Sequence, residues 1–391
     1  MAKNNEFKKK QKLSRRLRLI ILGGFLIFST TIGIMHQVLD KDKWVPVGVD
    51  ALCPFGGIES AYTLITSGSM LPKIAISSFI LLGATILIAI LFRRSFCGNI
   101  CALGALQELF DKIGKILLKK RYHIPKIIDR PARYLKYALL IAIIILSIVF
   151  GKLIIRPYDP WATYHHIISA DLFSEFLFGF IILLISIIGS VFYNRFFCKY
   201  LCPMGAFLGI INKIGIFRIK RNEKTCINCM ACDKACPVNI NIQKKSEITS
   251  SECLSCNECV NVCPEKDTLT IKTPGSKRHL SATTFLLISA LVFLIVVGST
   301  TLTGQFKWNL ESIYEHTIKT GAFDYSAIKG RDTFKDVSDA SGIPKEAFIK
   351  YFSLTEEEFS EPIKETAHKE GSNFDTADVR AFVHKQLESS L

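Results

Sequence analysis

Eight cysteines of this chain of 391 residues repeat one spacing, in which three thiols two residues apart precede a fourth that stands before a proline. This spacing is typical of the ligands of two 4Fe–4S clusters, because the fourth cysteine of each run reaches the other cluster. We therefore predict one cluster on Cys226, Cys229, Cys232 and Cys263. We predict a second cluster on Cys253, Cys256, Cys259 and Cys236.

Other chemistry for these cysteines fits less well. Zinc sites use pairs of cysteines two residues apart without this three-plus-one spacing, and disulfide frameworks belong to small secreted chains. Both ligand sets are complete, so the motif favours one-electron relay, and no catalytic residue is predicted. The stretches 217–219 and 269–271 flank the motifs and are expected to pair as strands. Residues 217–275, the cysteine-rich module, should form an α+β ferredoxin-like fold.

Four further cysteines, here called the bundle cysteines, form two pairs with three residues between the thiols: Cys97, Cys101, Cys198 and Cys202. Positions i and i+4 share one face of a helix, so each pair could present two thiolates to a third metal or iron–sulfur centre. The alternatives are small packing residues at helix ends or redox thiols. Recurrence of the pair favours the metal.

An internal repeat surrounds the bundle cysteines. Residues 96–105 align with 197–206, and Lys-Ile-Gly recurs at 112–114 and 213–215. Each copy follows an apolar segment. Two parallel copies of a helix–loop–helix–cysteine unit predict a four-helix bundle with a pseudo-twofold axis along the membrane normal.

The apolar residues are clustered as a bilayer requires, with 49% hydrophobic residues and a mean hydropathy of +0.30. Five segments approach the ~20 residues that span a hydrocarbon core. They are 19–36, 73–92, 137–155, 174–193 and 282–303. The first is interpreted as a retained span, with a cleaved signal peptide as the alternative.

The net charge of +15 is concentrated beside these segments, before the first and between the second and third. Positive charge at the ends of spans faces the cytoplasm. The N-terminus and the cysteine-rich module are therefore expected inside and the C-terminus outside a cell membrane. No recognition helix or aromatic-interleaved basic stripe accompanies the charge, so nucleic acid is not an expected partner.

These patterns predict a mainly α protein, a polytopic transmembrane bundle with the inserted module. The expected domains are a basic cytoplasmic tail (1–18), the four-span bundle (19–216), the module (217–275), a fifth span (276–303) and an extracytoplasmic helical domain (304–391). In the last domain, helices should begin at Asp332-Thr333, at Ser353–Glu358 and at Thr376, with a turn at Gly342–Pro344.

Near the expected outer face, His36, His165 and His166 are candidates for a quinone or a haem, and the alternative is that they are polar interface residues. Cys53 is interpreted as a loop thiol, with a redox or metal role as the alternative. Trp161 and Tyr158 are expected to be interfacial anchors.

With these motifs, the chain resembles the membrane-bound polyferredoxins of the NapH and NosR type over residues 20–280. The matching motifs are Phe96-Cys97-x3-Cys101, Phe197-Cys198-x3-Cys202-Pro203-x-Gly205 and the paired cysteine runs; Ala102 stands where the second copy has proline. The resemblance implies electron transfer between a quinol pool or a cytoplasmic donor and extracytoplasmic reductases.

The leading hypothesis is an electron-transfer subunit of an oxidoreductase system, with membrane lipid, quinone and redox proteins as partners and quinol dehydrogenase activity as a candidate. The alternative is a redox-sensing or assembly factor for the maturation of a membrane or periplasmic metalloenzyme.

Overall fold

The computed structural model of the protein describes residues 2–38, 53–58, 61, 76–119, 124–150, 155–168, 172–173, 175–273, 279–306, 308, 313–321, 323–328, 330, 332–367, 369 and 374–389. The chain divides into two compact units, Met1–Ser69 with Ile76–Lys307, and Met70–Ala75 with Trp308–Leu391. Most described residues are helical, which confirms the predicted mainly α class.

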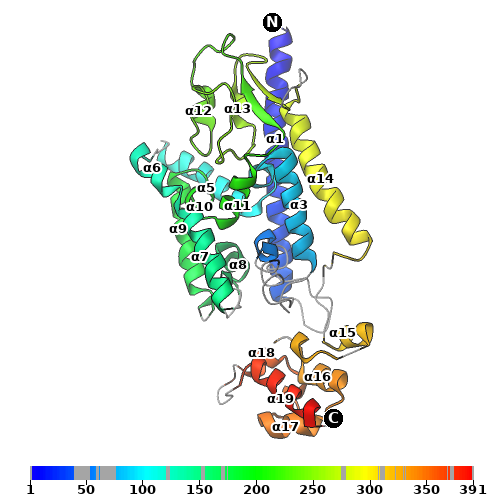
Figure 1. The fold of residues 1–391 in the computed structure, drawn as a ribbon. Helices are drawn as coiled ribbons and strands as arrows, with labels where there is room; N and C mark the ends of the chain where they lie inside the picture. Colours follow the sequence, from blue (N-terminus) through cyan, green and yellow to red (C-terminus); the bar gives the residue numbers. More distant parts are fainter. Residues whose placement is uncertain are drawn as a thin grey trace. The chain divides into compact units, whose positions relative to one another are not determined.

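Each of the five predicted apolar segments contains a helix. These helices are α1 (Ala2–Val38), α3 (Ile76–Phe92), α7 (Leu135–Phe150), α9 (Leu177–Phe192) and α14 (Ala282–Leu302). Among the described residues, α1 and α14 are long and apolar enough to cross a membrane, and α3 and α9 are shorter. Helix α14 packs against both α1 and α3, and the three lie side by side in Figure 1.

The two repeats have the same order of helices. Helix α3 is followed by α4 (Ser95–Asn99) and α5 (Ala102–Leu118), and α9 is followed by α10 (Phe196–Tyr200) and α11 (Pro203–Ile211). Helix α5 packs against α9, and α11 packs against α3. The last helix of each repeat therefore lies on the apolar helix of the other, and the repeats interlock.

The remaining described elements of the larger unit are short or lie in the module. Helices α6 (Lys126–Ala132) and α8 (Pro160–His165) and the 3-10 turn η2 (Arg156–Tyr158) connect the bundle. In the module, α12 (Ala231–Ala235) packs against α13 (Glu258–Val262). Strands β1 (Arg218–Arg221) and β2 (Leu269–Lys272) pair antiparallel, with Arg218 opposite Lys272, which confirms the predicted pairing.

The first half of α1 holds the module. Gln11 donates hydrogen bonds to the carbonyls of Val260 (3.2 Å) and Cys263 (2.8 Å), and Arg15 forms an ion pair with Glu258 at 3.0 Å. Residues 2–18, which the sequence suggests are a basic tail, are part of a continuous helix. Arg15 and Arg18, two of the charges that precede the apolar segment, therefore also bind the module.

A buried ion network continues this contact. The guanidinium of Arg18, 3% exposed, donates two 2.8 Å hydrogen bonds to the carboxylate of Glu108 and one of 2.9 Å to the carbonyl of Gly98. Arg195 donates to the same carboxylate at 3.1 Å. Burial by itself raises the pKa of Glu108, but the charges of Arg18 and Arg195 and their hydrogen bonds lower it to about 2. Arg18 also pairs with Glu258 of the module at 3.3 Å, so the network joins α1, α4, α5 and the start of α10 to α13.

Bundle side chains also hold the segment 248–253, which leads into the second cysteine run. Arg93 donates to the carbonyl of Ile248 (2.5 Å) and to Asn212 Oδ1 (2.8 Å). Asn212 in turn donates to the carbonyls of three module residues, Ser250, Ser251 and Cys253. Lys136 donates to both carboxylate oxygens of Glu252 at 2.6 Å. Bundle donors therefore fix the approach to Cys253.

The smaller unit is helical, as predicted. Its elements are α15 (Ile313–Thr320), η4 (Tyr325–Ala327), α16 (Phe334–Ser341), α17 (Lys345–Phe352), η5 (Glu358–Ser360), α18 (Ile363–Ala367) and α19 (Thr376–Ser389). Phe334, Phe348 and Phe382 meet in its core with ring centroids 5.2–6.1 Å apart.

Local signals in this unit are mostly confirmed. Thr333 caps α16 in a capping box with Asp336, and Gly342 ends that helix at φ +74°. The predicted helix start at Ser353 is wrong: Ser353 adopts φ +54° and ends α17. The reciprocal hydrogen bonds of Thr355 and Glu358 lead only into the short η5 turn, because Pro362 follows closely.

Phe348→Ala should destabilise the smaller unit by about 3–5 kcal/mol, because the fully buried ring leaves a cavity. Hydrogen exchange of the full chain should then quicken across residues 334–383 and stay unchanged in the module. Lys350→Ala, an exposed change on the same helix α17, is the matched control. Equal effects of the two variants would contradict the assigned core.

Glu108→Gln should weaken the junction between bundle and module by about 3–5 kcal/mol, because two buried guanidiniums lose their shared carboxylate. Faster hydrogen exchange at residues 95–101 and 252–259 would report the change. Glu247→Gln removes a carboxylate paired with Arg218 at the module surface and should change exchange little. If exchange at the junction is the same in both variants, the network does not stabilise it.

The same carboxylate predicts a pH dependence. The pKa of Glu108 is lowered from 4.5 to about 2 in the fold. Its ionised carboxylate therefore contributes its full stabilisation above pH 4.5, and this contribution is lost as the pH falls towards 2. The difference in unfolding free energy between wild type and Glu108→Gln should therefore be constant above about pH 5 and shrink below 4.5. A difference that grows on acidification would contradict the assignment.

Candidate functional site

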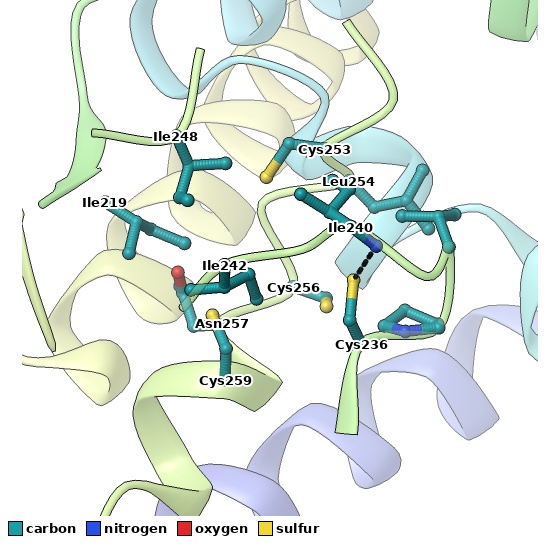
Figure 2. Close-up of a pocket in the computed structure, with 12 residues that line it drawn as sticks. Ile219, Cys236, Ile240, Ile242, Ile248, Cys253, Leu254, Cys256, Asn257 and Cys259 are labelled. Atoms are coloured by element: carbon teal, nitrogen blue, oxygen red, sulfur yellow. Dashed lines mark hydrogen bonds between the residues drawn. The ribbon is translucent and has the colours of Figure 1, made fainter. Parts of the chain in front are cut away.

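Four module cysteines line one buried cavity. Their sulfurs face the cavity in Figure 2, and the residues are Cys236, Cys253, Cys256 and Cys259, each between 6% and 9% exposed. Apolar side chains complete the wall, among them Ile240 and Leu254. The backbone N–H of Ile240 donates to Cys236 Sγ at 3.4 Å. These four cysteines are the same four that the spacing groups for the second cluster.

The other four module cysteines line a second cavity. They are Cys226, Cys229, Cys232 and Cys263, the group that the spacing assigns to the first cluster. Cys229 is exposed and the other three are half-buried. Ile227 and Met230 beside them are 58% and 49% exposed. One cavity of the module is therefore buried and the other lies close to its surface.

Both cysteine runs have the same backbone turns around their second cysteine. Asn228 and Met230 flank Cys229, and Ser255 and Asn257 flank Cys256; all four have φ between +51° and +59°. A left-handed residue turns successive N–H groups towards one side, and such nests bind anions and iron–sulfur clusters. The turns are therefore suited to donating backbone hydrogen bonds towards a cluster.

The thiols themselves need a metal if they are to be ionised. Burial raises the pKa of Cys256 to about 12, and that of Cys259 lies well above its usual value for the same reason. At neutral pH such thiols keep their protons unless bound iron displaces them. Among the described residues, no three His, Cys, Asp or Glu side chains converge on a single ion. A cubane has iron at four corners, so sulfurs that surround a cavity fit it.

The bundle cysteines are also brought together. Burial, followed by the neighbouring thiols of Cys198 and Cys97, raises the pKa of Cys101 to about 12. Cys97 and Cys198 are buried, and the thiol of Cys202 interacts electrostatically with those of Cys198, Cys97 and Cys101. Gln107 donates to Cys198 Sγ at 3.1 Å, and the backbone N–H of Gly205 donates to Cys202 Sγ at 3.2 Å.

The expectation that each pair shares the face of one helix is wrong. Cys97 and Cys198 lie in the short helices α4 and α10, whereas Cys101 and Cys202 are the N-cap residues of α5 and α11. The backbone is extended at both caps, with ψ of 118° and 111°. The chain turns between the two thiols of each pair, so the fold of the loop, and not helical periodicity, sets their approach.

The first bundle pair packs directly on the buried module cavity. A Cβ at Gly98 would lie 2.3 Å from the carbonyl oxygen of Leu254 and 3.2 Å from Cys256 Cβ, so only glycine fits there. Asn99 donates to the carbonyl of Ser255 at 3.4 Å. The three cysteine groups therefore follow in order: the surface group, the buried group and the bundle group.

The histidines that the sequence offers as quinone or haem candidates lie apart from the cysteine groups, against α1. His165 approaches Ser29 Oγ at 3.4 Å and meets the Trp161 ring edge-on at 4.6 Å. His166 stacks on Phe176 at 4.4 Å and contacts Gln37. His36 and Cys53 also have partners, Cys53 being half-buried. This polar and aromatic packing is what an interface role requires, and a quinone role stays a prediction.

Sequence reasoning missed the buried cations of the site: Arg18, Arg94, Arg195 and Lys136. A usable signal was present, because an arginine stands three residues before the first cysteine of each bundle pair, at 94 and at 195. From the sequence alone, such residues are interpreted as charges that orient a membrane segment, whereas the structure shows that they are buried.

Two family models match the chain. One, described as a 4Fe-4S binding domain, matches twice, at residues 74–125 and 175–222. The other, described as a 4Fe-4S dicluster domain, matches residues 218–265. The first model covers each repeat with its bundle pair, and the second covers all eight module cysteines.

Relatives extend the likeness over most of the larger unit. YccM of Escherichia coli K12 is 31% identical over 257 residues, 65% of this chain and 71% of YccM. Ferredoxin-type protein NapH of Haemophilus influenzae is 30% identical over 220 residues, 52% of this chain and 72% of NapH. Regulatory protein NosR of Stutzerimonas stutzeri is 28% identical over 181 residues, 44% of this chain and 24% of NosR. No solved structure matches the chain.

The resemblance predicted from the motifs is thereby confirmed. Paired cysteine runs, repeated bundle pairs and these relatives agree on one kind of protein. The chain belongs to the NapH/NosR-type family of membrane-bound ferredoxins and is an iron–sulfur electron-transfer protein.

Proposed function

We propose that this protein relays electrons between a cytoplasmic or quinol donor and an extracytoplasmic reductase system. The observation that carries the proposal is that the three cysteine groups follow one another in space. Gly98 of the bundle packs closely on Leu254 and Cys256 of the module. When bound, the two 4Fe–4S clusters supply one-electron transfer without bond making or breaking.

The eight module cysteines hold the clusters in the two sets that line the cavities. Their different exposure gives each set its own task. The surface set, with Cys229 exposed, faces solvent, where a redox protein could approach. The buried set faces the bundle, and the donors of Arg93, Asn212 and Lys136 keep its segment in place. Water is excluded on that side by apolar neighbours such as Ile240 and Leu254.

The four bundle cysteines hold a third iron–sulfur centre. Support comes from their mutual approach, from the recurrence of the pair in both repeats and from the match of the 4Fe-4S binding domain to each repeat. Their position next to the buried set makes this centre the next acceptor or donor in the chain.

The proposal includes a membrane arrangement, which the apolar helices and the charges support. The five apolar helices α1, α3, α7, α9 and α14 cross the cell membrane, with the N-terminus and module in the cytoplasm and the unit 308–391 outside. Lysines and arginines beside α1 and between α3 and α7 support this orientation. A quinone in the bilayer or an outer partner then completes the path beyond the bundle cysteines, because a ~30 Å core is too thick for one hop.

Anaerobic iron and sulfide analysis tests the number of centres. Wild type should hold about twelve irons, and the Cys97→Ser/Cys198→Ser variant about eight, because only the bundle centre is lost. Cys53→Ser, a thiol outside the three groups, should keep the wild-type content. About eight irons in wild type and variant alike would remove the third centre, and a redox-sensing or assembly role would replace the relay.

A further inference from the structure

An arginine precedes each bundle pair by the same distance. Arg94 stands three residues before Cys97, and Arg195 stands three residues before Cys198. Both side chains are among the most deeply buried of the described chain, Arg94 at 1% and Arg195 at 0% exposure. Burying a guanidinium is unfavourable unless an anion compensates it. Two such residues at equivalent positions therefore need a common explanation.

Each of the two arginine side chains extends from its own repeat to the other repeat. Arg195, from the second repeat, donates to the carbonyl of Cys97 at 2.8 Å, and a Cβ on Gly104 of the first repeat would lie 1.8 Å from its Nη1. Arg94, from the first repeat, lies against the second: a Cβ on Gly205 would lie 3.0 Å from Arg94 Nη2. Gly104 and Gly205 occupy the same place in the two repeats.

Each guanidinium therefore lies beside the bundle pair of the other repeat: the Cβ position of Gly205 that faces Arg94 Nη2 is 3.4 Å from Cys202 Cβ, and Arg195 reaches the carbonyl of Cys97. Arg94 interacts electrostatically with the thiols of Cys97, Cys202 and Cys198. Arg195 interacts with those of Cys198 and Cys101. The two arginines, one from each repeat, therefore act electrostatically on all four thiols.

The carboxylates nearby do not balance this charge. Glu108 is shared between Arg195 and Arg18. Glu252 lies 4.0 Å from Arg94 and is held at 2.6 Å by the buried Lys136. Glu258 pairs with Arg18 as well, so three carboxylates face the four buried cations, and neither Arg94 nor Arg195 has a carboxylate to itself. Moreover, Nε of Arg94 and Nε of Arg195 are buried without a hydrogen-bond partner among the described residues.

We propose that Arg94 and Arg195 form a crossed pair that binds the anionic iron–sulfur centre of the bundle cysteines and raises its reduction potential. The inference rests on the third centre of the proposed function. Four thiolates around a 4Fe–4S core leave a net negative charge that grows by one on reduction. Positive charge and N–H donors beside the sulfurs favour the reduced form. The bundle centre is therefore a better electron acceptor than it would be without the two arginines.

Arg195→Gln and Arg94→Gln test this in the full chain, purified anaerobically in detergent. The probe is a redox titration followed by EPR, with iron and sulfide counted on the same samples. Each variant should shift the midpoint of the bundle signal to lower potential by at least tenfold in the reduction equilibrium constant, about 59 mV for one electron. The two module signals should keep their midpoints. Arg218→Gln, which removes a guanidinium on β1 that pairs with Glu247, should shift none of the three.

Arg195→Lys and Arg94→Lys cover the case in which glutamine prevents assembly. Lysine keeps the charge, so these variants should retain the bundle iron even if the glutamine variants lose it while their module signals persist. Glutamine variants with full iron and unshifted midpoints would overturn the inference and leave the third centre intact. Wild type with only about eight irons would overturn the third centre and the inference together.

Discussion

Buried positive charge at the junction of bundle and module is the constraint on which the rest of this structure depends. Arg18, Arg93 and Lys136 are removed from water, and each has a partner in the module: Glu258, the carbonyl of Ile248 and Glu252. Separating the two parts would break these ion pairs and hydrogen bonds, and any charge that stayed buried would be left without its partner. The module is therefore held in one position on the bundle instead of moving as a carrier.

That fixed position explains how a small α+β module and a helical bundle act together. The second cysteine run lies on the Cys97–Cys101 loop because Gly98 has no side chain to keep Leu254 away. The first run is left at the surface with Cys229 exposed. The second repeat supplies the other bundle pair. Because α5 packs on α9 and α11 packs on α3, the two equivalent cysteine loops are brought together. The docking of the module and the packing of the two repeats together place the three cysteine groups next to one another.

Much of this could be predicted, because the relevant signals are local. The spacing around Cys226 and Cys253 predicts the groups that line the two cavities, and apolar runs locate the helices. Capping chemistry located Thr333 at a helix start. What failed depends on tertiary context: Ser353 matched a helix start, but it ends α17 in the left-handed region.

The cations are the clearest case of missing information. Arg94 and Arg195 read as surface charges beside apolar segments, and only the fold turns them inward beside the bundle cysteines. The helix break at Cys101 and Cys202 is similar, because i and i+4 spacing is compatible with one helix and with two. In both cases the sequence shows which residues matter without showing where they point.

The central claim is that the buried module group and the bundle group are neighbours held in fixed contact. EPR of the fully reduced protein tests it most directly, because two paramagnetic centres in contact split each other's signals. We expect a splitting in wild type that is absent from Cys97→Ser/Cys198→Ser, in which only the coupling between the two module clusters remains. A wild-type signal with the same splitting as the variant would contradict the contact.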